Sequence, residues 1–269
     1  MRLRLWSVGI LLLGLVPSFA RADNTPTLTN LTQSEADTIA KNFGNAIVFR
    51  SLEPPSANGK IWGFGLGLVF DATSAGHVNE VLRAHGNSQD ISALPAGDIV
   101  GTVQLPLGIA AEIGFLPRVS IKGFSAVRTG FNAKWTFTDV FFHDRLPFNA
   151  ALRMGYGKNE FKYGQTTSGV ADTVEFDSKA FRTELALSPR LPLIEPYLGF
   201  GLISTSSTLK NTATASIYNF TTANSYDYSK SSFLFNLGFE FRLLVLAASA
   251  QVEWAFGETT GSAKLGLKF

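Results

Sequence analysis

The chain has 269 residues, with 23 Lys and Arg, 21 Asp and Glu, 23 Phe, 25 Gly and no cysteine. Without cysteine there is no disulfide framework and no thiolate metal site, and we expect neither a metal nor a cofactor. The formal net charge of +2 depends on Arg2, Arg4 and Arg21, because removing them leaves 20 basic and 21 acidic residues. A chain so nearly neutral gives no reason to expect a nucleic-acid partner.

Residues 1–22 have the composition of an export signal. Arg2 and Arg4 precede the apolar run WSVGILLLGLV, which is shorter than the roughly 20 residues that a membrane-spanning helix needs. Residues 20–22 (Ala-Arg-Ala) then place small residues at a cleavage site. We predict a signal peptide at 1–22, with a retained membrane anchor as the alternative.

Residues 23–58 are predicted to form an N-terminal segment with one amphipathic helix at 35–50. Ser34 is a candidate N-cap, and Arg50 has the charge that the C-terminal end of a helix favours. Two prolines at 54 and 55 follow, which cannot continue the helix. The apolar residues that recur at helical spacing are Ala36, Ile39, Ala40, Phe43 and Ile47.

Residues 59–269 alternate apolar and polar side chains with the period of a β-strand. In the first predicted strand, Lys60–Phe70, the residues on one face are Trp62, Phe64, Leu66, Leu68 and Phe70. The opposite face carries Gly63, Gly65, Gly67 and Val69. A run of glycine on one face indicates either the close approach of another backbone or relief of crowding in a narrow barrel.

The same alternation predicts the remaining strands and their connections. Further strands are expected at 98–104, 107–116, 127–141, 148–156, 173–188, 194–207, 226–242, 246–256 and 262–269. Short turns containing Leu-Pro or residues 242–245 alternate with longer connections at 72–97, 117–126, 158–172, 208–225 and 257–261. This gives about ten strands, with eight or twelve as alternatives if 98–130 divides differently.

An apolar, aromatic exterior around a partly polar interior is the pattern of a barrel surrounded by lipid. Because backbone groups in lipid must be paired internally, such strands close on themselves. We therefore predict an all-β fold, a transmembrane antiparallel up-and-down β-barrel with an N-terminal amphipathic helix. The helix would lie in the periplasm or inside the barrel as a plug.

The C-terminal strand resembles that of Gram-negative outer-membrane β-barrels. Phe269, with Leu267 and Leu265 at alternate positions, is similar to the C-terminal signal that the barrel-assembly machinery recognises in that class. The resemblance implies a place in the cell outer membrane, with the lipid bilayer, lipopolysaccharide and the barrel-assembly machinery as partners.

Several charged residues are predicted to face the lumen, with acids and bases nearly equal in number. They are Glu112, Lys134, Arg153, Arg182, Glu184, Glu240, Arg242, Glu253 and Lys264. In a narrow barrel these side chains are expected to pair across the lumen and close it. A charge-selective pore would show an excess of one sign.

Three classes of function follow from these features. The glycine-lined GFGLGLVF, the Leu-Pro turns and IEPYLGFG resemble the outer-membrane transporter family for fatty acids and aromatic hydrocarbons. That resemblance implies uptake of a small solute, apolar solutes included, through a plugged lumen. If the helix at 35–50 is the plug, we expect Phe43 and Ile47 to lie against Gly63, Gly65 and Gly67 of the first strand.

The alternatives are a closed structural barrel and an enzyme. The Ser- and Thr-rich stretch 206–225 could serve surface recognition or adhesion. His77 and His85, in the first predicted outer loop, have no serine partner at a fixed spacing, and His143 lies at a predicted periplasmic turn. A lipid-modifying enzyme is therefore the least expected class, and we predict no enzyme activity.

Overall fold

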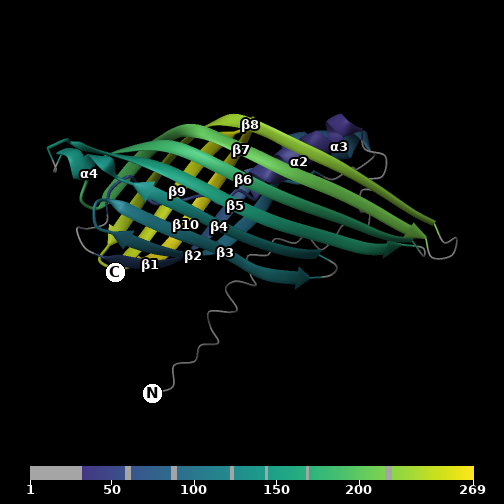
Figure 1. Ribbon diagram of the computed structural model, residues 1–269, viewed down its shortest axis with the longest axis horizontal. Coiled ribbons are helices and arrows are strands. Elements are labelled where there is room, and N and C mark those ends of the chain that lie inside the picture. Colours follow the sequence, from purple (N-terminus) through teal and green to yellow (C-terminus); the bar gives the residue numbers. More distant parts are fainter. Residues whose placement is uncertain are drawn as a thin grey trace, which may run out of the picture.

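A computed structural model describes residues 32–57, 62–85, 90–121, 124–142, 145–167, 170–215 and 220–269. Within them, ten antiparallel strands form one closed barrel in which each strand pairs with the next along the chain, and β1 pairs with β10 (Figure 1). The predicted up-and-down barrel of about ten strands is confirmed. The predicted signal peptide at 1–22, Lys60 and His143 lie outside the described residues.

The ten strands differ more than twofold in length. Their bounds are β1 Gly63–Ser74, β2 Ala93–Leu105, β3 Ile109–Ile121, β4 Phe124–Trp135, β5 Phe148–Thr167, β6 Val170–Pro189, β7 Ile194–Ala215, β8 Phe220–Leu243, β9 Leu246–Ala255 and β10 Glu258–Lys268. Strands β5 to β8 have 20, 20, 22 and 24 residues, whereas β9 has 10. The wall is therefore much taller on one side of the barrel.

Four stretches predicted as outer loops are mostly strand. Residues 117–126, 158–172 and 208–225 continue β3 to β8 as antiparallel ladders, and residues 258–261 begin β10. In the extensions of β5 to β8, outward side chains such as Lys158 and Lys162 are polar, and apolar side chains such as Phe161 and Leu209 pack in the cluster around α2. The apolar-outward alternation that predicted the other strands is therefore missing there. Pro117 lies within β3, where the register shifts between Leu116 and Val119, a place that tolerates a residue without a backbone N–H.

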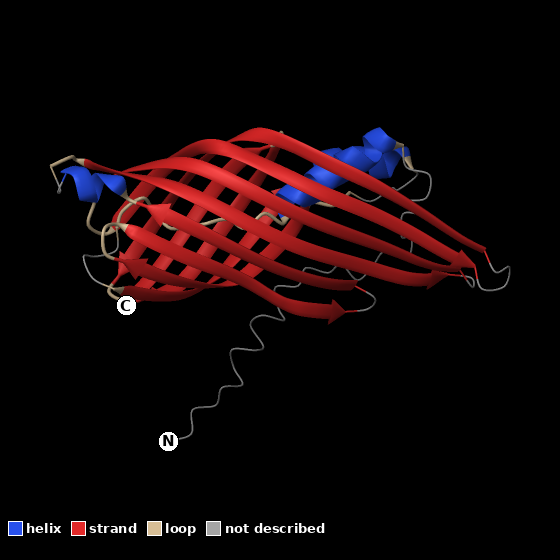
Figure 2. Ribbon diagram, viewed as in Figure 1, coloured by secondary structure: helices blue, strands red, loops and turns tan. Residues whose placement is uncertain are grey.

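The described helices are α2 (Gln33–Ala46), α3 (Gly76–Ala84) and α4 (Phe137–Phe142). Figure 2 shows α2 and α3 within and beside one end of the barrel, and α4 at the other end. The end of β4 was predicted to continue as strand to residue 141, but the strand ends at Trp135 and α4 follows.

Helix α2 begins and ends earlier than the sequence predicts. Thr32 rather than Ser34 is the N-cap, and it forms a capping box with Glu35. The helix ends at Ala46, and Arg50 lies beyond it in extended chain. The guanidinium of Arg50 still donates to the Asn45 carbonyl, 2.8 Å away, so it satisfies the end of the helix from outside.

Apolar side chains cover the outside of the barrel, and polar side chains fill it. Phe233, Phe64 and Leu265 are 82%, 57% and 63% exposed, whereas Glu240 and Asn236 are fully buried. This arrangement is the reverse of a water-soluble protein and matches a barrel in lipid. The protein is an outer-membrane β-barrel. None of the described helices is long and apolar enough to cross a bilayer.

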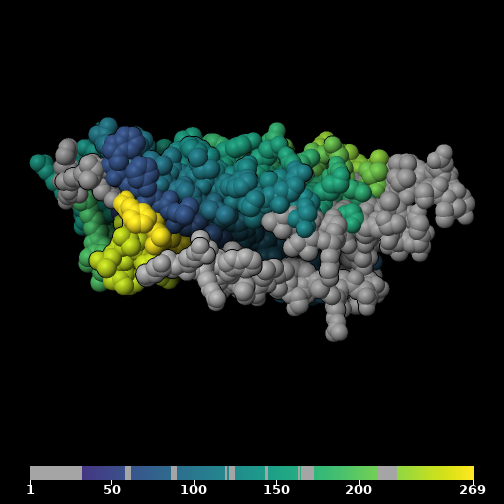
Figure 3. Space-filling view, turned by 90° about the horizontal axis from the view of Figure 1, so that it is seen from below, coloured from purple at the N-terminus to yellow at the C-terminus, as the bar shows by residue number. Residues whose placement is uncertain are grey.

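The two ends of the barrel can be told apart by how far the strands extend. The start of β1 and the end of β10 lie at one end, together with the connections 106–108, 136–147, 190–193 and 244–245, whereas β5 to β8 are extended at the opposite end. Barrels of this class have their longer extensions on the cell-surface side, so the first of these ends is the periplasmic end. Figure 3 shows the C-terminal residues, in yellow, next to those of the first strand. The tall part of β5 to β8 projects at the opposite end (Figure 1), which therefore faces the cell surface.

Candidate functional site: the chain segment in the barrel lumen

Residues 47–57, here called the lumen segment, leave α2 as an extended chain inside the barrel. Val48 through Pro55 are all buried. Pro54 and Pro55 have no backbone N–H and disfavour helix in the residue before them. Since the segment belongs to no helix or sheet, its buried backbone carbonyls need other partners. The barrel wall supplies them as side chains.

Strand β4 and the residue after it hold the prolines of the lumen segment. The ammonium of Lys134 donates to the carbonyls of Pro54 and Ser56, each 2.8 Å away. The hydroxyl of Thr136 donates to the carbonyl of Pro55 at 2.6 Å. Three consecutive carbonyls are thus bound by two wall residues, which fixes the path of the chain at the periplasmic half of the lumen.

Two arginines hold the lumen segment farther along in the same way. Arg153 of β5 donates to the Glu53 carbonyl, and Arg128 of β4 donates to the Val48 carbonyl. Both guanidinium groups are buried. Because a buried charge is costly unless it is paired, each arginine also pairs with wall carboxylates, Arg153 with Glu184 at 2.7 Å.

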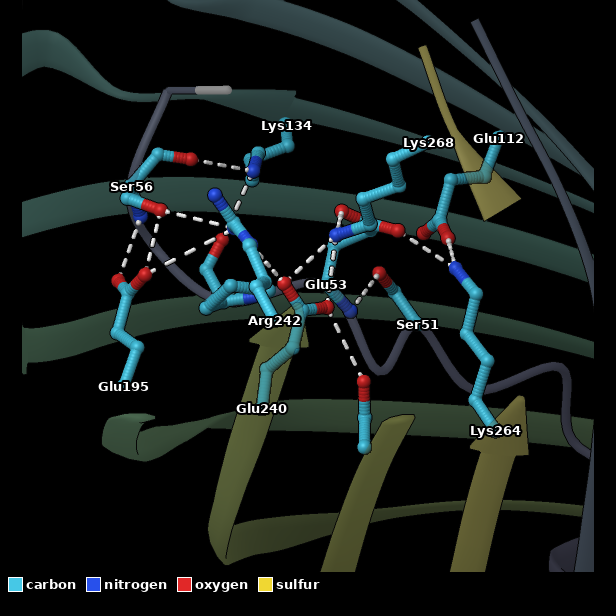
Figure 4. Close-up of polar contacts among 12 residues, drawn as sticks. Ser51, Glu53, Ser56, Glu112, Lys134, Glu195, Glu240, Arg242, Lys264 and Lys268 are labelled. Carbon is cyan, nitrogen blue, oxygen red and sulfur yellow. Dashed lines mark hydrogen bonds and ion pairs between the residues drawn. The ribbon is translucent and has the colours of Figure 1, made fainter. Parts of the chain in front are cut away.

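The Glu53 carboxylate is the main ionic anchor of the lumen segment (Figure 4). Its two oxygens accept from Lys264 at 2.6 Å and from Lys268 at 2.7 Å, both on β10. Each lysine also contacts a wall carboxylate, Lys264 with Glu112 at 3.3 Å and Lys268 with Glu240 at 2.7 Å. The anchor is therefore one part of a network that spans the lumen.

Ser56 joins the lumen segment to the periplasmic end of β7. Its backbone N–H and hydroxyl donate to the two oxygens of Glu195, at 3.1 and 2.6 Å. Ser188 donates to the same carboxylate at 2.6 Å, and Arg242 contacts the Ser56 hydroxyl at 3.3 Å. Figure 4 shows Glu195, Arg242 and Lys134 reaching Ser56 from three different strands.

Deeper in the lumen, ion pairs form a chain across four structural elements. Arg50 of the lumen segment pairs with Glu253 of β9 at 2.9 Å, and Glu253 pairs with Arg182 of β6 at 2.8 Å. Arg182 also pairs with Glu184 at 2.7 Å, which in turn pairs with Arg153. Signs alternate along this chain, so each buried charge has an opposite neighbour.

Glycines of the wall make room for one aromatic side chain of the lumen segment. A Cβ atom added at Gly114 or Gly130 would lie 2.1 or 2.3 Å from the ring of Phe49, far inside contact distance. A Cβ atom added at Gly157 would lie 3.4 Å from the backbone nitrogen of Phe49. Strands β3, β4 and β5 thus carry glycine because another part of the chain packs directly on their backbone.

The predicted contact of Phe43 and Ile47 with the glycine face of β1 is wrong. The Phe43 ring lies 6.1 Å from that of Phe161 and 5.9 Å from that of Phe176, on β5 and β6. Ile47 packs against the same cluster. Helical spacing gives the apolar face of a helix, but it does not give the wall strand toward which that face turns.

The glycines of β1 make room for wall side chains instead. An added Cβ at Gly65 would meet Lys268 at 3.7 Å, and one at Gly67 would meet Lys264 at 3.2 Å. At Gly63 the nearest side chain is Gln104, at 3.5 Å. The missing side chain at Gly67 thus leaves room for Lys264, which anchors the Glu53 carboxylate.

The structure places eight of the nine predicted lumen charges among buried residues and leaves Arg242 half-buried. The sequence prediction omitted Asp71, Asp98, Arg128, Glu195, Lys268, Arg50 and Glu53. Lys268 lies four residues after Lys264 on β10, so both side chains point to the same face, and the same alternation could have predicted Lys268 as a lumen charge. Arg50 and Glu53 lie outside any strand, so only the fold reveals their role.

The outer end of the lumen is filled by α2 and α3. His77 of α3 contacts the Glu258 carboxylate, and His85 lies 3.1 Å from the Glu35 carboxylate. In the described part of the chain, no three His, Asp or Glu side chains are grouped to hold a metal ion. Both histidines thus link helices to neighbouring carboxylates.

The three residues of the expected assembly signal lie on the outside of β10. Phe269, Leu265 and Leu267 are 72%, 63% and 39% exposed. The Phe269 N–H donates to the Phe64 carbonyl at 2.8 Å, and the Phe64 N–H donates back at 3.0 Å. The backbone of the terminal residue is therefore part of the closed wall, and its ring is free to contact lipid.

Several solved barrels are similar to this chain in overall form. Ail of Yersinia pestis is 12% identical, with 77% of this chain and 97% of that chain covered and a TM-score of 0.34. The translocator domain of autotransporter NalP from Neisseria meningitidis is 10% identical, with 79% and 89% covered and a TM-score of 0.43. A TodX deltaS2S3 mutant, a monoaromatic hydrocarbon channel, is 10% identical, with 78% and 68% covered and a TM-score of 0.34.

No curated protein matches the sequence. The profile of one family, described as "Family of unknown function (DUF6588)", matches residues 24–269. That match spans the wall strands, α2 and the lumen segment together. The chain therefore belongs to the family of unknown function DUF6588.

Proposed function

We propose that this outer-membrane barrel passes a small solute when its N-terminal part, α2 and the lumen segment, moves out of the lumen. The observation that carries the proposal is the way the segment is held. Its backbone is bound by wall side chains such as Lys134 and Thr136, and no wall strand pairs with it. The segment can therefore leave without breaking the barrel.

The two halves of the lumen suggest what such a solute would meet. Around α2, the wall presents an apolar cluster that includes Phe176, Leu209 and Tyr228. Toward the periplasm the wall is charged, with Lys134 and Lys264 among the groups that hold the segment. The half of the lumen around α2 would accept the apolar part of a small solute, as the family resemblance in the sequence also implies. The charged periplasmic half would favour a polar group at the other end of that solute.

A reversible lock on α2 tests the proposal. The chain has no cysteine, and a Cβ at Gly44 would lie 3.3 Å from the Ser207 Oγ atom. The double variant Gly44→Cys/Ser207→Cys is therefore expected to join α2 to β7 by a disulfide. In planar bilayers the oxidised variant should stay silent, and reduction should restore brief openings. Openings of equal size and frequency in both states would contradict the proposal.

The second candidate is a closed barrel with a structural or surface-recognition role. The alternating ion pairs Arg50–Glu253–Arg182–Glu184 favour it, because they leave no charge of the lumen segment unpaired. Silence of the protein in bilayers under reducing conditions, even after Glu53→Gln weakens the anchor to Lys264 and Lys268, would favour this function instead.

A further inference from the structure

The outer surface of β5 and β6 carries like charges directly opposite each other. Lys158 is the register partner of Lys179, and in the next outward-facing row Glu160 is the partner of Asp177. Like charges in directly opposed positions destabilise a sheet. If Lys179 and Asp177 were exchanged, Lys158 and Glu160 would each have an oppositely charged register partner.

The neighbouring row shows that this sheet can pair opposite charges. Lys162 is the register partner of Glu175, and their charged atoms are 2.6 Å apart. In the row formed by Lys158 and Lys179, here called the basic row, Lys158 contacts Glu160 of its own strand at 2.7 Å. Lys179 has no ion pair with any residue that the structure describes. The basic row therefore lacks one negative charge.

The basic row lies directly above the aromatic rim of the membrane-facing surface. The next outward-facing pair toward the periplasm is Tyr156 and Phe181, each 46% exposed. Two residues along a strand correspond to about 6.6 Å. Aromatic girdles mark the edge of the apolar band, and β5 and β6 project toward the cell surface. The two lysines are thus at the level of the headgroups of the outer leaflet.

We propose that Lys158 and Lys179 form a binding site for a phosphate group of lipopolysaccharide in the outer leaflet. The phosphate supplies the negative charge that the basic row lacks, and the acyl chains lie against Tyr156 and Phe181 below it. In the next outward-facing row, Glu160 is already paired with Lys158 and Arg118, and Asp177 disfavours a phosphate, so the site is confined to Lys158 and Lys179. This role concerns the outer wall and does not depend on passage through the lumen.

Binding of purified lipopolysaccharide to the full-length protein in detergent micelles tests the site. Each neutralised lysine should weaken binding about fivefold, and the variant Lys158→Gln/Lys179→Gln about 25-fold. Lys162→Gln is the matched control, because its partner is Glu175, and it should bind as the unchanged protein does. Dephosphorylated lipopolysaccharide should bind all of these proteins equally weakly.

A charge reversal separates binding from folding. Lys179→Glu places an acid directly opposite Lys158, so it should raise the urea midpoint of unfolding in detergent without lipopolysaccharide and lower the affinity for lipopolysaccharide. The proposal is overturned if the double glutamine variant keeps its affinity, if Lys162→Gln loses as much, or if removal of the phosphates does not weaken binding. Protease resistance confirms that each variant is folded.

Discussion

The Nε atom of Arg50 lies 2.9 Å from the Oε1 atom of Glu253, and both side chains are completely buried. One group belongs to the chain inside the lumen and the other to the barrel wall. Because neither charge can reach water, each depends on the other. This contact joins the lumen segment to the chain of ion pairs that crosses the barrel.

Removing the positive charge should therefore be costly. Arg50→Met leaves Glu253 with only Arg182 as a partner, and we expect the free energy of unfolding to fall by about 3 kcal/mol. Urea titration of the refolded protein measures it. The exposed pair Arg83–Asp90 provides the control, because Arg83→Met should change stability by less than about 1 kcal/mol. Equal losses in the two variants would show that burial of the pair is not decisive.

The contact of Phe49 with wall glycines predicts a steric effect. Gly130→Ala places a methyl group 2.3 Å from the Phe49 ring, and overpacking of this kind costs about 1–3 kcal/mol. The double variant Phe49→Ala/Gly130→Ala should regain part of that loss. Gly101→Ala is the control, since no atom lies within 4 Å of its added Cβ. Absence of coupling between Phe49 and Gly130 in this cycle would contradict the packing described.

The first turn of α2 should respond to acid through Glu35. Hydrogen bonds from Thr32 to the Glu35 carboxylate, foremost from its backbone N–H, lower the pKa of Glu35 below its usual 4.5. A lowered pKa means that the carboxylate stabilises the helix above pH 4.5 and that this contribution is lost as the pH falls through the lowered pKa.

Glu35→Gln isolates this effect. At pH 7 the variant should be cleaved faster by protease near the start of α2, and the difference from the unchanged protein should disappear as the pH falls through the lowered pKa of Glu35, because both side chains are then neutral. Rates of limited proteolysis measure it. A difference that persists unchanged at low pH would exclude the carboxylate as its cause.

The terminal aromatic ring should matter for assembly more than for stability. Phe269→Ala keeps both backbone hydrogen bonds to Phe64, so the refolded variant should unfold at nearly the same urea concentration. If the ring is the signal for the barrel-assembly machinery, less of the variant should reach the outer membrane in cells. Normal assembly in cells would show that Phe269 is not required as a signal.

Much of the wall could be predicted because apolar and polar side chains alternate along the part of each strand that crosses the membrane. The positions of Glu112, Lys134 and Glu253 in this alternation were enough to place them on the inner face, since a strand has only two faces. The polar stretches 158–172 and 208–225 could not be predicted as strand. They stand above the membrane, where outward side chains such as Lys158 and Lys162 are polar and apolar side chains such as Phe161 and Leu209 pack around α2, so the apolar-outward alternation is absent.

The lumen segment could not be predicted because its contacts cross the barrel. Arg50 has the charge expected at the end of a helix, and nothing in the sequence shows that it reaches Glu253, 203 residues away. Likewise, the spacing of Phe43 within α2 does not fix the rotation of the helix. These contacts depend on barrel closure, which brings distant strands to opposite sides of one narrow space.

The wall of ten strands has its ladder hydrogen bonds complete from β1 to β10, and the lumen segment adds none to it. If the segment is released as proposed, the wall keeps its ladder hydrogen bonds and loses side-chain partners, such as Arg50 for Glu253 and Glu53 for Lys264. Release would therefore cost the energy of these side-chain contacts and not that of the ladder. Substitutions at the contacts would then change how readily the lumen empties while the strand pairing stays the same.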